Sequence, residues 1–158
     1  MAHELRDRLV AMGSEQAQAF HDILHVYEGL ADRYGLWDAA NIMMEWCSDD
    51  GFIDFRAWLI AQGKEVYLSA LKDPDTLADI EPYGNCCFES LSYVGDDTYR
   101  QLTGQNAYEM QIPPPRKKWK AILGADIVYR EDIRFPRPRR ALPAAYPRLC
   151  AKYGGAER

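Results

Sequence analysis

The segment from residue 45 to residue 58 holds the densest group of chemically active side chains in this sequence. It reads E-W-C-S-D-D-G-F-I-D-F-R-A-W and combines four carboxylates, one thiol, one guanidinium and two indoles. Paired acids, an arginine and tryptophans together could hold a small polar or cationic group. We therefore predict a site for a small polar ligand or a peptide here, formed by Trp46, Asp49, Asp50, Asp54, Arg56 and Trp58.

Two other interpretations of this segment stay open. It can be a capped helix junction, because turns and helix starts concentrate Ser, Asp and Gly for local reasons. It can also be the active site of an enzyme that tailors a peptide or a small metabolite, with Asp50 or Asp54 as general base and Arg56 holding an anion. A carboxylate in a walled cleft with a raised pKa would favour the enzyme over a binding module.

The sequence does not contain the motifs that are typical of other kinds of chemistry. The run S-D-D-G-F-I-D does not have the spacing of a calcium loop, and the chain contains no C-x-x-C, P-loop, G-x-G-x-x-G or G-x-S-x-G. His21 and His25 share a helical face that could bind a metal, but we favour a solvated face. Cys47 precedes an expected helix start, where a thiolate is favoured, but we prefer a buried packing role. We predict no metal and no cofactor.

The elements that must position these residues are helices. Apolar side chains recur at steps of three and four residues, which predicts a helix from Ser14 to Tyr34 with Ser14 as N-cap and Gly35 as the stop. Gly95-Asp96-Asp97 should separate the last two short helices of this region. The fold class is therefore mainly all-α. The other expected helices cover residues 5–12, 36–47, 52–62, 64–71, 86–93 and 98–102.

The net charge of −5 hides a division along the chain. Residues 1–110 carry 20 acidic and 7 basic side chains, whereas residues 111–158 carry 4 acidic and 12 basic ones. Prolines at 113–115 and the run P-R-P-R-R at 136–140 predict a largely extended segment. We predict a compact acidic helical domain over 1–110, with the basic, proline-rich segment 111–158 packed on it.

The composition also indicates in which compartment the protein is expected and which classes of partner it is expected to bind. No apolar run approaches the ~20 residues of a membrane span, and the first residues do not read as a secretory leader. Four cysteines, two of them adjacent, favour the reduced thiols of a cytoplasm. The acidic majority argues against nucleic acid as a general partner. The basic segment could still contact an acidic partner, which is a third functional alternative.

Three motifs resemble the pattern of one family. They are W-D-A-A at 37–40, C-S-D-D-G-F-I-D-F-R-A-W-L-I-A-Q-G at 47–63 and D-P-D-T-L-A at 73–78. The pattern is similar to that of a bacterial family of small helical proteins known only as a domain of unknown function. Y-P-R-L with K-Y-G at 146–154 resembles the end of that pattern, while 112–140 has no counterpart in it. The resemblance implies one helical domain in a bacterial cytosol and supplies no substrate.

Overall fold

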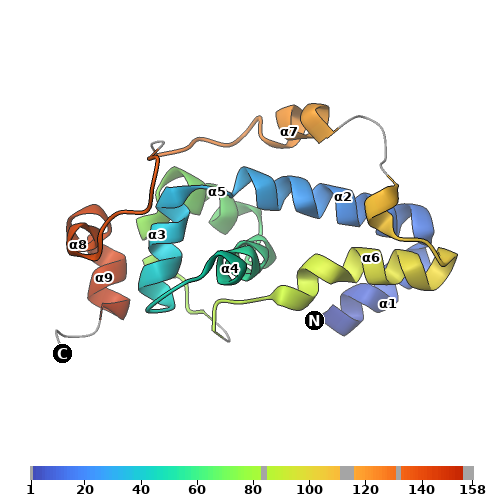
Figure 1. Ribbon diagram of the computed structural model, residues 1–158, viewed down its shortest axis with the longest axis horizontal. Coiled ribbons are helices and arrows are strands. Elements are labelled where there is room, and N and C mark those ends of the chain that lie inside the picture. Colours follow the sequence, from blue (N-terminus) through green and yellow to red (C-terminus); the bar gives the residue numbers. More distant parts are fainter. Residues whose placement is uncertain (1, 83–84, 111–115, 131–132, 155–158) are drawn as a thin grey trace. The chain divides into compact units, whose positions relative to one another are not determined.

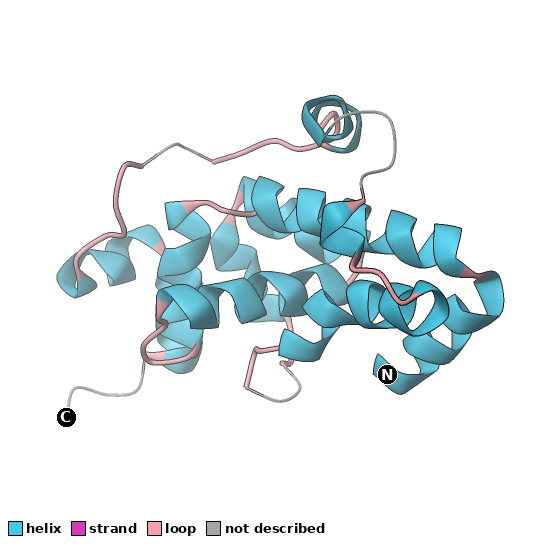
Figure 2. Ribbon diagram, turned by 45° about the vertical axis from the view of Figure 1, so that its right-hand side comes forward, coloured by secondary structure: helices cyan, strands magenta, loops and turns pink. Residues whose placement is uncertain are grey.

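The computed structural model describes residues 2–82, 85–110, 116–130 and 133–154. These residues form helices joined by turns and loops, with no strand among them (Figure 1, Figure 2). The predicted mainly all-α class is confirmed. The chain divides into two compact units, each built from two separate segments: Met1–Leu30 with Phe88–Ala125, and Ala31–Cys87 with Asp126–Arg158.

In the first unit, the helix that begins at Ser14 packs along the helix that begins at Glu89, and the N-terminal helix contacts both. Gly13 joins the first two helices with φ +102°, a backbone conformation that glycine adopts without a steric penalty. The prediction of a short first helix ending at Gly13 is confirmed. The helices of this unit are α1 (Ala2–Met12), α2 (Ser14–Leu30), α6 (Glu89–Thr103), η2 (Ala107–Glu109) and α7 (Arg116–Leu123).

Helix α6 runs straight through Gly95-Asp96-Asp97, so the predicted break there is wrong. A Cβ on Gly95 would lie 2.8 Å from Cβ and 2.9 Å from Cα of His21 on α2. The glycine therefore permits two helices to approach closely and does not mark a turn. Asp96 is buried beside it and accepts a hydrogen bond from the backbone N–H of Ala107 at 2.6 Å.

The second unit has an aromatic and aliphatic core. Phe52, Phe55, Trp58 and Tyr146 are among its largest buried side chains. The C-terminal helix packs on the first helix of this unit and on a 3₁₀ turn that begins at Pro74. The elements of this unit are α3 (Tyr34–Met43), α4 (Asp49–Ala61), α5 (Lys64–Lys72), η1 (Pro74–Asp79), η3 (Arg139–Ala141), α8 (Leu142–Ala145) and α9 (Pro147–Tyr153).

The predicted helix over 14–34 is too long at its C-terminal end. Helix α2 ends at Leu30, and the N–H of Arg33 turns back to the carbonyl of Ala31 at 2.9 Å. The carbonyl of Arg33 then accepts the first hydrogen bonds of α3. Gly35, predicted as a stop, lies in the first turn of that helix. The apolar spacing continues past Leu30 because both helices bury their apolar sides.

Ion pairs connect the basic C-terminal residues of the second unit with its acidic residues 31–87. Among the described residues they include Arg137–Asp38 at 3.1 Å, Arg130–Asp73 at 3.5 Å and Lys152–Glu81 at 2.8 Å. The described part of 111–158 contributes to both units and contains α7, η3, α8 and α9, which is more helix than a largely extended segment has. The prolines at 113–115 lie outside the described residues.

No described helix combines the length and the apolar character that crossing a membrane requires.

Candidate functional site

The predicted site falls at the junction between α3 and α4. Ser48 is the N-cap of α4, and its Oγ accepts a hydrogen bond from the N–H of Gly51 at 3.0 Å. A Cβ on Gly51 would lie 3.2 Å from that Oγ, so the turn fits a glycine closely. Because Ser48 caps the helix, Asp49 and Asp50 in its first turn complement the helix dipole without acting as the cap.

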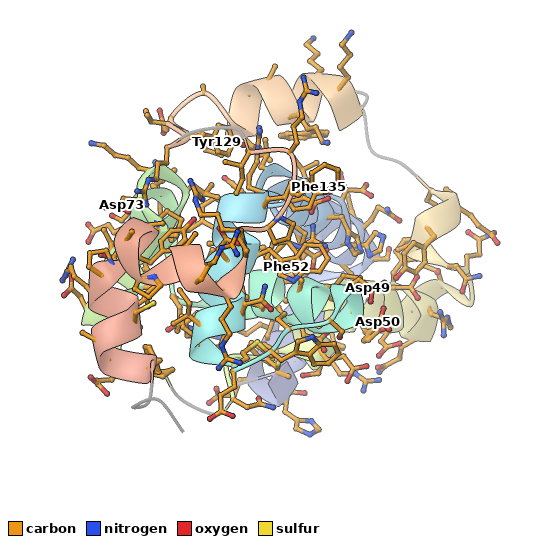
Figure 3. The ribbon with its side chains drawn as sticks, turned by 60° about the vertical axis from the view of Figure 1, so that its left-hand side comes forward. Asp49, Asp50, Phe52, Asp73, Tyr129 and Phe135 are labelled. Carbon is orange, nitrogen blue, oxygen red and sulfur yellow. The ribbon has the colours of Figure 1, made fainter. Side chains whose placement is uncertain are left out.

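Trp46 and three carboxylates lie on the surface of this junction. The indole of Trp46 is 74% exposed, and Glu45, Asp49 and Asp50 are exposed as well. None of these four side chains makes a hydrogen bond or an ion pair with the described part of the chain. Figure 3 labels Asp49 and Asp50 at the start of α4. We refer to Glu45, Trp46, Asp49 and Asp50 as the Trp46 surface.

Two of the predicted site residues are used inside the unit. Trp58 has no exposed surface and belongs to the core. The Arg56 guanidinium lies 4.9 Å from the centre of the Phe52 ring, its Nε donates to the Phe52 carbonyl at 3.3 Å, and its Nη1 lies 3.7 Å from Oδ1 of Asp32. Trp46, Asp49 and Asp50 therefore lie on the surface, whereas the side chains of Arg56 and Trp58 pack inside the unit.

The thiol of Cys47 is held in its neutral form. Burial, followed by the charges of Cys87 and Asp54, raises the pKa of Cys47 to about 11. Its Sγ lies 3.4 Å from the carbonyl oxygen of Ser48, to which it donates. A thiolate is disfavoured here at neutral pH, so the geometry supports the packing role and not the nucleophile.

The candidate general bases lie in different surroundings. Asp50 is exposed at the start of α4, and Asp54 is half-buried near the thiols of Cys47 and Cys87. Neither carboxylate is among the residues that line a hollow of the second unit between Arg33, Leu71 and Tyr146. No group of three His, Cys, Asp or Glu side chains among the described residues is arranged to hold a metal ion.

His21 and His25 do not form the solvated helix face that the sequence favoured. His21 is 1% exposed, and the two rings meet edge to face with centres 4.4 Å apart. Nδ1 of His25 lies 2.6 Å from Oε2 of the buried Glu28. The face is covered because α6 packs along α2, and the ring of Tyr108 lies 4.6 Å from His21.

The structure also contains a group of residues that the sequence did not indicate. Three arginines, Arg33, Arg130 and Arg137, line one hollow of the second unit together with Tyr129 and Tyr146. They come from the start of α3 and from residues far along the chain, so no local motif could reveal them. The basic run at 136–140 is the one signal that pointed toward this region.

The fold and the site define an all-α protein with an acidic, aromatic surface at a helix junction. Residues 1–101 match the model of DUF4240, a family described as a protein of unknown function, and the chain belongs to this family. The matched residues include the motifs at 37–40, 47–63 and 73–78, whereas 146–154 lie beyond them. A comparison with curated proteins and one with solved structures each give no match.

Proposed function

We propose that this protein is a binding module whose Trp46 surface holds a cationic peptide segment of a partner. The observation that carries the proposal is the 74% exposure of Trp46 beside carboxylates that have no partner among the described residues. Tryptophan is prominent among the residues that dominate binding energy at interfaces, and its ring attracts cations. A lysine or arginine side chain on the indole would also be attracted by the charges of Asp49 and Asp50, three and four residues further along the chain.

The electrostatics of the junction favour a cation despite the helix start. The N-terminus of α4 contributes about half a positive charge, whereas Glu45, Asp49 and Asp50 bring three negative charges. Ser48 already caps the helix, which leaves both aspartates available to an incoming charge. Such a surface steers a cationic partner and makes its binding sensitive to salt.

An apolar contact is available beside the acids. Ile53 is 41% exposed and follows Asp49 by four and Asp50 by three residues on α4, so these side chains share one face of the helix. A peptide that carries an apolar side chain next to its Lys or Arg fits this arrangement better than a free metal ion or a small polyamine. The whole surface lies inside the residues that match the family model.

The experiment is a binding titration of the full chain with a fluorescently labelled peptide of Lys, Leu and Gly. A peptide with Glu in place of Lys serves as the control ligand. We expect binding of the Lys peptide that weakens as salt is added, and a loss of at least about tenfold in Trp46→Ala. Phe135→Ala is the matched aromatic control, because Phe135 is 75% exposed.

Two double variants, each of which removes two negative charges, test how far peptide binding depends on the acids of the Trp46 surface. Asp49→Asn/Asp50→Asn should weaken peptide binding at least about fivefold, an effect of about 1 kcal/mol. Glu89→Gln/Asp97→Asn removes the same charge from exposed positions of α6 and should leave binding within about twofold. Equal losses in the two double variants would contradict the proposal, as would a Trp46→Ala variant that binds like the wild type.

A further inference from the structure

Helix α7 exposes a basic face. The helix packs on α2 within the first unit (Figure 1), and Trp119 and Leu123, which lie four residues apart and therefore on one side of α7, are half-buried. Lys117 and Lys118 are exposed, and so is Ile122, which keeps 53% of its surface accessible. We refer to Lys117, Lys118 and Ile122 as the α7 face.

The two lysines of the α7 face have no partner among the described residues. Neither side chain makes a hydrogen bond or an ion pair with the described part of the chain. Both lie in the first turn of α7, and no acidic side chain lies in that turn. Because the N-terminal end of a helix is positive, the two cations are repelled by this end and by each other. Acidic groups from another molecule would therefore stabilise the arrangement.

The α7 face repeats the pattern of the Trp46 surface with the opposite charge. The two aspartates of the Trp46 surface lie in the first turn of α4, three and four residues before Ile53, which is 41% exposed. The two lysines of the α7 face lie in the first turn of α7, four and five residues before Ile122. Each helix thus carries an adjacent pair of like charges and, about one turn further, an exposed isoleucine. When two such helices lie side by side, opposite charges meet and both isoleucines lose contact with water.

We propose that the cationic segment held by the Trp46 surface is the α7 face of a second copy of this chain. The inference rests on the proposed function, since it names the partner of the Trp46 surface. The α7 face supplies the lysines and the neighbouring apolar side chain that this surface requires. Every copy carries both patches, and the two patches are different. The contact is therefore heterologous, and it joins copies head to tail.

A surface rich in phosphate, such as an anionic lipid bilayer, is the other class of partner that lysines attract. Residues 1–110 carry 20 acidic and 7 basic side chains, so most of the chain repels an extended anionic surface. A small acidic patch on a protein needs to meet only the α7 face. The charge distribution therefore favours the Trp46 surface of another copy.

The test is sedimentation equilibrium of the full chain over a range of concentrations at low and at high salt. We expect an average mass above the 18.1 kDa of one chain that rises with concentration and returns to that value as salt is added. Lys117→Glu/Lys118→Glu should weaken the association at least about tenfold. Arg139→Glu/Arg140→Glu is the matched control, because it reverses two adjacent, exposed cations that have no bonding partner among the described residues. It should leave the association within about threefold.

A mixture of two variants tests which patches meet. Trp46→Ala lacks the indole of the Trp46 surface but keeps the α7 face, whereas Lys117→Glu/Lys118→Glu keeps the Trp46 surface and lacks the α7 face. Neither variant should associate alone. Mixed together, each supplies the patch that the other lacks, so we expect a complex of one chain of each variant. Thermal unfolding checks that both variants are folded.

The labelled Lys peptide separates this inference from the proposed function. A wild type that binds the peptide through Trp46 but stays monomeric at every concentration overturns the inference and leaves the proposed function standing. Association of Lys117→Glu/Lys118→Glu like that of the wild type also overturns it, as does a mixture that forms no complex. Binding of a monomeric wild type to vesicles of phosphatidylcholine and phosphatidylserine would overturn it as well and identify lipid as the partner of the α7 face.

Discussion

The hydroxyl of Tyr146 lies 3.1 Å from Oδ2 of Asp38, although 108 residues separate the two in the sequence. Neither residue has exposed surface, and Arg137 donates hydrogen bonds to both. Charged hydrogen bonds in a buried setting are stronger than those at the surface. This contact therefore ties the C-terminal segment to α3, and Tyr146 also lines the hollow that Arg33, Arg130 and Arg137 border.

Tyr146→Phe should lower the free energy of unfolding by about 1.5–3 kcal/mol, because the buried carboxylate of Asp38 loses a donor while the ring keeps its packing. Urea denaturation measures the change. Tyr93→Phe removes the same hydroxyl from a ring that is 48% exposed and should change the free energy of unfolding by less than about 0.5 kcal/mol. Similar values for the two variants would show that the contact does not stabilise the fold.

The stability contribution of Asp38 should depend on pH in a direction set by its burial. Burial raises the pKa of Asp38 above 3.8 despite the hydrogen bonds from Arg137 and Tyr146. As the pH falls, the folded state therefore takes up this proton before the unfolded state does. From neutral pH down to about 4, the free energy of unfolding of the wild type should rise relative to that of Asp38→Asn. Urea titrations at several pH values measure this difference in the free energy of unfolding. A difference that stays constant or decreases as the pH falls would contradict the expectation.

Local patterns predicted the parts of the fold that depend on neighbours in the chain. Helical periodicity indicated the all-α class, and the cluster of Ser and Asp before Phe52 marked the start of α4. The same patterns could not separate Trp46 from Trp58, because both indoles belong to one run and tertiary packing alone buries the second. The arginine hollow was missed for a similar reason, since its lining joins residues from position 33 to position 146.

The buried thiols should stay neutral and slow to react. Burial, with a smaller effect from the charge of Cys87, raises the pKa of Cys86 to about 11, as it does for Cys47. Because the folded pKa values exceed the ordinary thiol value of 9.0, the stability that these neutral thiols contribute is present below pH 9 and is lost as the pH rises toward 11. Alkylation with iodoacetamide at pH 8, read by mass spectrometry, should leave both thiols unmodified in the folded protein and modify them in urea. Rapid alkylation of Cys47 in the folded protein would contradict this.

Arg56→Ala should destabilise the fold more than Lys64→Ala. The Arg56 side chain is 12% exposed and packs on the Phe52 ring, so its removal should cost about 1–2 kcal/mol of unfolding free energy. Lys64 and its partner Asp126 are 74% and 69% exposed, and such pairs contribute less than about 0.5 kcal/mol in most proteins. Thermal unfolding compares the two variants directly. If both variants changed the unfolding temperature equally and by almost nothing, Arg56 would not be a residue that anchors the fold.

Two glycines in the first unit should respond to alanine with opposite signs. In Gly95→Ala the new methyl group would meet Cβ and the backbone of His21 at 2.8–3.0 Å, so α2 and α6 have to separate. Such overpacking costs about 1–3 kcal/mol, whereas the gain in helix propensity is at most about 1 kcal/mol. The net effect on the free energy of unfolding is therefore a loss. In Gly29→Ala the nearest atoms are the flexible end of Lys120 at 3.5 Å, so the gain in propensity should remain.

Urea denaturation should therefore show a lower free energy of unfolding for Gly95→Ala and an equal or higher one for Gly29→Ala. Both positions are helical and both changes add one methyl group, so the comparison isolates the effect of the neighbouring backbone. If Gly95→Ala were as stable as Gly29→Ala, α2 and α6 would have to be free to move apart at little cost. Gly95 would then not be needed for the close approach of these helices.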